Sequence, residues 1–98
     1  MSKKVNIAVQ VLPKTTNNND TYQIVDKAIE IIQKSGIKYR VCPFETVLEG
    51  DYDKIMTVIK QMQEACFEAG AKEVITNIKI QNRKNSDVTI EGKMNKYD

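Results

Sequence analysis

The sequence predicts one α+β domain over residues 1–98, an antiparallel sheet with two helices on one face. The first observation is a duplicated pattern. Residues 31–41 end an apolar helical face, reach a glycine and begin a β-rich run, and residues 66–76 do the same. The second observation is alternation of apolar and polar residues before and after the helical stretches. Two strand–helix–strand units, in the order β-α-β-β-α-β, predict a ferredoxin-like sandwich.

Each strand and helix follows from its local pattern. Valine and isoleucine at odd positions predict a first strand over residues 5–12, which Pro13 should end. Apolar residues at helical spacing predict helices over residues 20–35 and 51–69, with Tyr22 and Phe67 in the core. Asp20 or Thr21 should cap the first helix and Asp51 the second, and a glycine should end each. Three further strands are expected over residues 37–42, 46–49 and 72–81.

The tail, residues 87–97, fits either a strand or a short helix. Its apolar residues Val88, Ile90 and Met94 have little else to cover them, so we expect the tail to dock on a neighbour. Right-handed connections place the first and third strands in the centre of the sheet, with the first beside the fourth.

The face of the sheet without helices should carry rows of polar side chains. This face could be exposed to solvent, form a semi-polar interface between subunits, or offer donors and acceptors to a small polar ligand. Its expected residues are Asn6, Ala8, Gln10, Asn77, Lys79 and Gln81.

Composition excludes several function classes. The net charge of +2 is too small to indicate nucleic-acid binding, and the absence of histidine removes the commonest general base and zinc ligand. No apolar run is long enough to span a membrane. Neither a signal peptide nor metal-ligand spacing is visible, and Cys42 and Cys66 should be reduced thiols. We therefore expect a cytoplasmic protein without metal or catalytic cofactor.

The clearest candidates for chemistry lie around the joint between the two units. Glu45 and Glu49 flank Thr46, but nothing in the sequence supplies a nucleophile beside them. A carboxylate that balances a cationic ligand is therefore preferred to catalysis, and a solvated strand edge is the structural alternative. Phe44 and Tyr39 lie near the same hairpin, where a ring could stack on a heterocycle or face a cation.

Three segments, residues 6–13, 44–50 and 78–83, make the chain resemble the small thiamine-binding protein family of bacteria, archaea and yeast. Thr46 and Glu49 match its Thr-x-x-Glu block, and Lys79 and Arg83 match its fourth-strand turn. Phe44 and Glu45 stand where many relatives have a glycine before the threonine. The resemblance implies a ferredoxin-like fold, dimers joined through sheets into a tetramer, and binding of thiamine or its pyrimidine part without chemistry.

Thiamine combines an aminopyrimidine with a cationic thiazolium, and this chain has residues of matching chemistry. We expect Glu49, a strand-end carboxylate outside the core, to balance the cation, with Thr46 beside it and Gln10 or Asn77 completing the polar contacts. The full set of expected ligand-binding residues is Gln10, Tyr39, Phe44, Thr46, Glu49, Asn77 and Lys79. Two alternatives stay open: a regulatory or assembly module that binds protein through the open sheet face, and an enzyme acting through Glu49.

Overall fold

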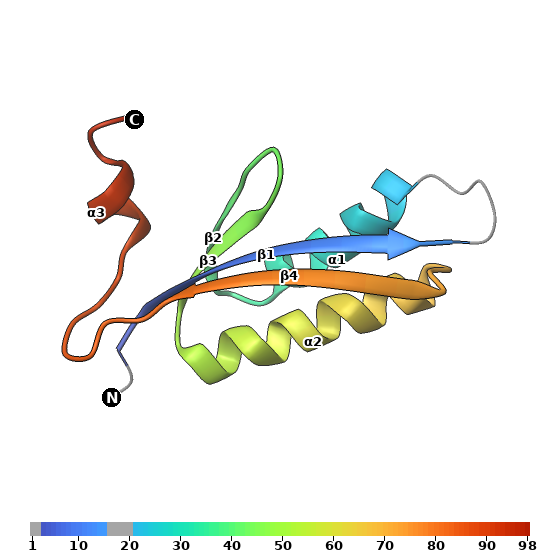
Figure 1. The fold of residues 1–98 in the computed structure, drawn as a ribbon, viewed down its shortest axis with the longest axis horizontal. Coiled ribbons are helices and arrows are strands. Elements are labelled where there is room, and N and C mark those ends of the chain that lie inside the picture. The colour runs from blue at the N-terminus through green and yellow to red at the C-terminus, as the bar shows by residue number, and fades with distance from the viewer. Residues whose placement is uncertain (1–2, 16–20) are drawn as a thin grey trace.

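The computed structural model describes residues 3–15 and 21–98 and has the predicted ferredoxin-like fold. Its four strands form one antiparallel sheet in the order β2-β3-β1-β4, so β1 and β3 are central, as predicted. Figure 1 shows α3 at one end of the sheet and the start of α1 at the other. The elements are β1 (Val5–Lys14), α1 (Thr21–Lys34), β2 (Lys38–Val41), β3 (Thr46–Gly50), α2 (Tyr52–Glu68), β4 (Glu73–Gln81) and α3 (Ile90–Met94).

The core lies between α1, α2 and one face of the sheet, which we call the helix face. The odd-numbered β1 residues from Val5 to Val11 are buried there, as their alternation predicts. The helices cover them with stripes at helical spacing, and the opposite face of the sheet is called the open face below. The buried helical residues are Ile24, Ala28 and Ile32 of α1, and Ile55, Val58, Ile59, Met62 and Cys66 of α2.

The helix ends are largely those that the sequence predicts. The Asp51 carboxylate accepts a hydrogen bond from the Lys54 backbone N–H at 3.1 Å and caps α2. Gly36 and Gly70 follow α1 and α2 with φ of 78° and 112°, a region that favours glycine. Of the two proposed caps of α1, Thr21 is the first residue of the helix itself, and Asp20 lies outside the described residues. No helix among the described residues has both the length and the apolarity to cross a membrane.

The prediction that Pro13 ends the first strand is wrong, because β1 continues to Lys14 and pairs Pro13 with Val74 of β4. On its other side, β3 pairs with β1 only from Val5 to Val9. At Pro13 that edge therefore has no partner strand within residues 3–15 and 21–98, and a strand tolerates proline at such an edge.

The prediction that Tyr22 and Phe67 are core residues is also wrong, since their exposed fractions are 79% and 51%. Each helical residue advances the direction of its side chain by about 100°. Tyr22 is two positions from buried Ile24, so its ring points away from the core. Phe67 follows buried Cys66 directly and lies at the margin of the stripe.

The tail forms a short helix, α3, which is one of its two predicted conformations. Thr89 caps α3 by accepting a hydrogen bond from the Gly92 N–H at 3.0 Å. Val88 and Ile90 are buried within the chain, with exposed fractions of 0% and 8%. The chain's own sheet therefore covers these two side chains.

Candidate functional site

The structure divides the seven predicted ligand-binding residues between two faces of the sheet. Directly paired residues of antiparallel strands share a face, so the strand register assigns each one. Four belong to the open face, two to the helix face, and one lies in the turn between β2 and β3. The open-face residues are Gln10, Glu49, Asn77 and Lys79. The helix-face residues are Tyr39 and Thr46, and the residue in the turn is Phe44.

The expected polar rows exist on the open face, but several of their side chains already pair with one another. The Asn77 amide donates to Gln10 Oε1 at 3.1 Å, and Lys79 Nζ lies 3.2 Å from Glu45 Oε2. Polar groups that the sequence predicts to contact a ligand therefore contact one another instead. A ligand at these residues would have to replace the existing contacts.

Glu49 is not the exposed strand-end carboxylate that the sequence predicts. Its side chain is 4% exposed, and Oε1 accepts a hydrogen bond from the Ile90 N–H at 2.6 Å. Lys38 Nζ lies 3.8 Å from Glu49 Oε2 and 3.1 Å from Glu91 Oε1. The prediction failed because a tail far along the chain folds over the end of β3, which local sequence does not reveal.

The C-terminal segment, residues 87–98, is held to the open face by side chains from all four strands. The Asp98 carboxylate raises the pKa of Arg40, first through its hydrogen bond to the guanidinium and then through its negative charge. The segment therefore covers one end of the open face. The contacts are Asn6 Nδ2 to Val88 O at 2.9 Å, Arg40 Nη1 and Nη2 to Asp98 at 2.9 and 3.1 Å, Glu49 to Ile90, and Lys93 Nζ to Gln81 Oε1 at 2.9 Å.

Thr46 lies on the opposite side of the sheet from Glu49, so the expected contact between them is absent. Thr46 pairs with Val9, a helix-face residue, and is 5% exposed. Tyr39 lies on the same face at the edge strand and is 38% exposed. An odd spacing of three along a strand puts two side chains on opposite faces.

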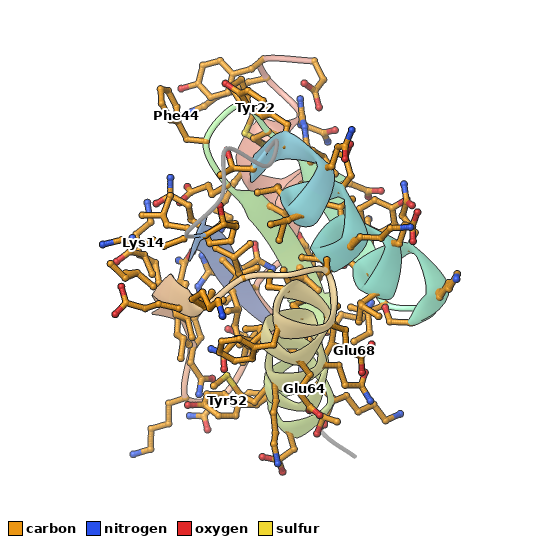
Figure 2. The ribbon with its side chains drawn as sticks, turned by 90° about the vertical axis from the view of Figure 1, so that its right-hand side faces the viewer. Lys14, Tyr22, Phe44, Tyr52, Glu64 and Glu68 are labelled. Atoms are coloured by element: carbon orange, nitrogen blue, oxygen red, sulfur yellow. The ribbon has the colours of Figure 1, made fainter. Side chains whose placement is uncertain are left out.

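A cleft of about 360 Å³ lies where α1 begins, between that helix and the β2–β3 turn; we call it the aromatic cleft. Phe44 and Tyr22 line it and are 82% and 79% exposed. Figure 2 shows the two rings at the same end of the molecule. Apolar residues of β1 and α1 form its wall, and it also includes Gln10 and Thr46. Three of the seven predicted residues, Phe44, Gln10 and Thr46, therefore line this cleft, although the side chain of Gln10 belongs to the open face.

Two acidic residues line the aromatic cleft. Glu45 is paired with Lys79, whereas Asp26 has no ion-pair partner among the described residues. The edge of β1 beyond Val9 also reaches the cleft, and β3 does not pair with it there. The cleft thus offers aromatic faces, a carboxylate and backbone hydrogen-bonding groups.

Tyr22 and Asp26 are not among the residues that the sequence predicts for the site. The helical spacing of Tyr22 predicts a core residue, and Asp26 resembles any solvated residue of an amphipathic helix. The available signal was their spacing of four residues, which places both side chains on one face of α1. Among the described residues no group of histidine, cysteine and acidic side chains could hold a metal ion.

A profile of the family described as thiamine-binding protein matches residues 7–98. The chain belongs to this family. A relative from Clostridium perfringens, named as a UPF0045 protein, is 40% identical over 92 residues, covering 94% of this chain and 95% of the relative. The family profile and this relative thus each match nearly the whole length of the chain.

Solved structures agree with this family assignment. A domain of unknown function from Bacillus cereus has a TM-score of 0.94 at 46% identity, and the match covers 99% of this chain and 92% of that one. A Thermotoga maritima protein, named for a proposed role in thiamine biosynthesis or salvage, has a TM-score of 0.84 at 32% identity, covering 97% and 99%. The ferredoxin-like fold is therefore shared with experimental structures of relatives.

Proposed function

We propose that this protein binds thiamine, or a related pyrimidine or thiazolium compound, in the aromatic cleft without transforming it. The observation that carries the proposal is the meeting of two exposed aromatic rings with the carboxylate of Asp26, which has no ion-pair partner among the described residues. Membership of a family described as thiamine-binding supports the choice of ligand.

The chemistry of the cleft matches the parts of thiamine. A flat heterocycle can stack on Phe44 or Tyr22, and a thiazolium cation is attracted both by an aromatic face and by a carboxylate such as Asp26. An aminopyrimidine edge needs one acceptor and one donor, which the edge of β1 near Gln10 can supply from its backbone. A cleft of about 360 Å³ lies in the usual size range of small-molecule sites.

Binding is preferred to catalysis because the cleft lacks an activated nucleophile. The chain contains no histidine, and the Cys42 thiol in the cleft contacts the Arg40 carbonyl oxygen at 3.8 Å rather than a base. The alternative of a module that binds protein through the open face is less supported, because polar side chains there pair with one another. Two free thiols suit the reducing cytoplasm, where we propose that the protein works.

Calorimetric titration with thiamine, thiamine phosphates and the free aminopyrimidine tests the proposal. Asp26→Asn should weaken thiamine binding about tenfold and leave binding of the uncharged aminopyrimidine nearly unchanged. Phe44→Ala should weaken both. Glu64→Gln removes the same charge from the exposed surface of α2, away from the cleft (Figure 2), and should change neither affinity. Equal thiamine affinity in Asp26→Asn and the parent would refute the placement of the cation in this cleft.

We further propose that the working form is a homotetramer made of two sheet-paired dimers. The outer edge of β4 has nine residues and no partner strand among the described residues. Such an edge is a template for strand pairing. In an antiparallel pair of β4 strands related by a two-fold axis at Thr76, Glu73 of each copy lies opposite Lys79 of the other, so the charges are complementary.

Charge exchange tests this pairing. Light scattering of Lys79→Glu should show a smaller assembly than the parent, because like charges then face each other twice. The double variant Glu73→Lys with Lys79→Glu should restore the parent mass. The intrachain pair Lys14–Glu73 is exposed and the pair Glu45–Lys79 is partly exposed, so the loss of each should cost about 1 kcal/mol or less. A parent that is monomeric at micromolar concentration would refute the tetramer.

A further inference from the structure

Asn6 carries a buried hydrogen-bond acceptor with no partner among the described residues. The side chain is 3% exposed and lies on the open face at the end covered by the C-terminal segment. Its amide nitrogen donates to the Val88 carbonyl oxygen at 2.9 Å, which fixes the orientation of the amide group. Oδ1 is therefore the atom left without a donor. Buried acceptors normally have a donor, so this unpaired oxygen indicates a place for a hydrogen-bond donor from a ligand.

Two clefts adjoin Asn6 beneath the C-terminal segment. One, of about 250 Å³, extends toward Lys79 and Gln81 of β4. The other, of about 290 Å³, extends toward Arg40 of β2 and is walled by Ile90 and Met94. Asn6, Val47 and Lys93 line both clefts. Lys93 is exposed and lines both clefts, so its side chain lies between them above Asn6.

The charge of these clefts is opposite to that of the aromatic cleft. Three cations, Arg40, Lys79 and Lys93, line them with a single carboxylate, that of Glu45. The Lys93 ammonium contacts the neutral amide oxygen of Gln81 and forms no ion pair among the described residues. Arg40 already holds a carboxylate, that of Asp98, through two parallel hydrogen bonds. This is the geometry in which arginine recognises carboxylate ligands.

We propose that these clefts form a second ligand site, for a small carboxylate that also carries an amide N–H and an apolar group. The carboxylate takes the place of Asp98 on Arg40 and contacts Lys93. The amide N–H donates to Asn6 Oδ1, and the apolar group packs on Val47 and Met94. The C-terminal segment acts as a cover that must loosen at Asp98 to admit the ligand. This proposal does not depend on thiamine binding, because the positive charge here disfavours a thiazolium.

Hippurate (N-benzoylglycine) is a suitable probe because it has all three groups, and its binding can be measured by calorimetry. The parent should bind it with a dissociation constant of about 1 mM or below. Arg40→Gln and Lys93→Gln should each weaken binding about tenfold or more, because each removes a charge-assisted contact. Asp98→Asn should tighten it severalfold, since the competing carboxylate is removed. Lys60→Gln, on the exposed surface of α2, removes one positive charge elsewhere and should leave the affinity unchanged.

Matched probes test the two polar contacts in the parent protein, without a risk of misfolding. Benzoyloxyacetate replaces the amide N–H with an ester oxygen and should bind about tenfold more weakly than hippurate; hippuramide lacks the carboxylate and should lose most of the affinity. Saturating thiamine should not displace hippurate. Equal binding of the ester would overturn the role of Asn6. Absence of saturable hippurate binding, or unchanged affinity in both Lys93→Gln and Asp98→Asn, would overturn the site.

Discussion

Replacing Glu49 by glutamine should destabilise the fold, because this carboxylate joins the end of β3 to the start of α3. Its side chain is 4% exposed, and Oε1 accepts the Ile90 N–H at 2.6 Å. Lys38 lies 3.8 Å from the other oxygen. Glutamine preserves the size of the side chain and one acceptor but removes the negative charge. It also introduces an NH₂ group where an oxygen faced an ammonium.

The expected cost is about 2–6 kcal/mol of unfolding free energy. A hydrogen bond to a charged group contributes about 1.5–3 kcal/mol and a neutral one about 0.5–1.5 kcal/mol, so the bond to Ile90 loses about 1–2 kcal/mol. A buried NH₂ without an acceptor adds about 1–3 kcal/mol. The pair with Lys38 adds less than about 1 kcal/mol, because the Lys38 side chain is 47% exposed.

Urea unfolding at one fixed protein concentration measures this cost, and hydrogen exchange of the Ile90 amide locates it. The control is Glu45→Gln, which removes the same charge from a partly exposed pair with Lys79 and should cost about 1 kcal/mol or less. If Glu49→Gln unfolds like the parent and the Ile90 amide exchanges no faster, the structural role is wrong. Weaker thiamine binding by such a stable variant would instead restore the sequence-based role of Glu49 as the ligand's counter-charge.

Three further predictions concern the glycine after α1 and the two cysteines. Gly36→Ala should lower the unfolding free energy by about 1–2 kcal/mol, because a φ of 78° is strained for alanine even though no atom lies within 4 Å of the added methyl group. An unchanged urea midpoint would contradict this. Burial raises the pKa of the Cys66 thiol, so the contribution of this thiol to the unfolding free energy is constant below the ordinary thiol pKa and falls as pH rises through that value. This fall of the unfolding free energy with pH should disappear in Cys66→Ala. Both cysteines should be dispensable for binding, so a folded Cys42→Ser, Cys66→Ala double variant should titrate with thiamine like the parent.

Local sequence predicts the fold well but predicts only part of the candidate site. The alternation in β1, the stripe from Ile55 to Cys66 and the cap at Asp51 each depend on neighbours within a few residues, and the structure confirms them. Phe44 was recognised as a residue near the joint, and it lines the aromatic cleft. Its partners Tyr22 and Asp26 were not recognised, because they come from a helix that meets the β2–β3 turn only after folding.

By itself, the sequence determined the order of the elements, the faces of β1 and β4 and the family resemblance, since hydrophobic periodicity and glycine stops are local properties. Tertiary structure alone decided the role of Glu49. Residues 49 and 90 lie 41 positions apart, and their hydrogen bond forms only when the C-terminal segment crosses the sheet. The same crossing buries Asn6 and closes the clefts above it. Whether a polar residue meets solvent, a ligand or its own chain depends on such distant contacts, which a local pattern does not encode.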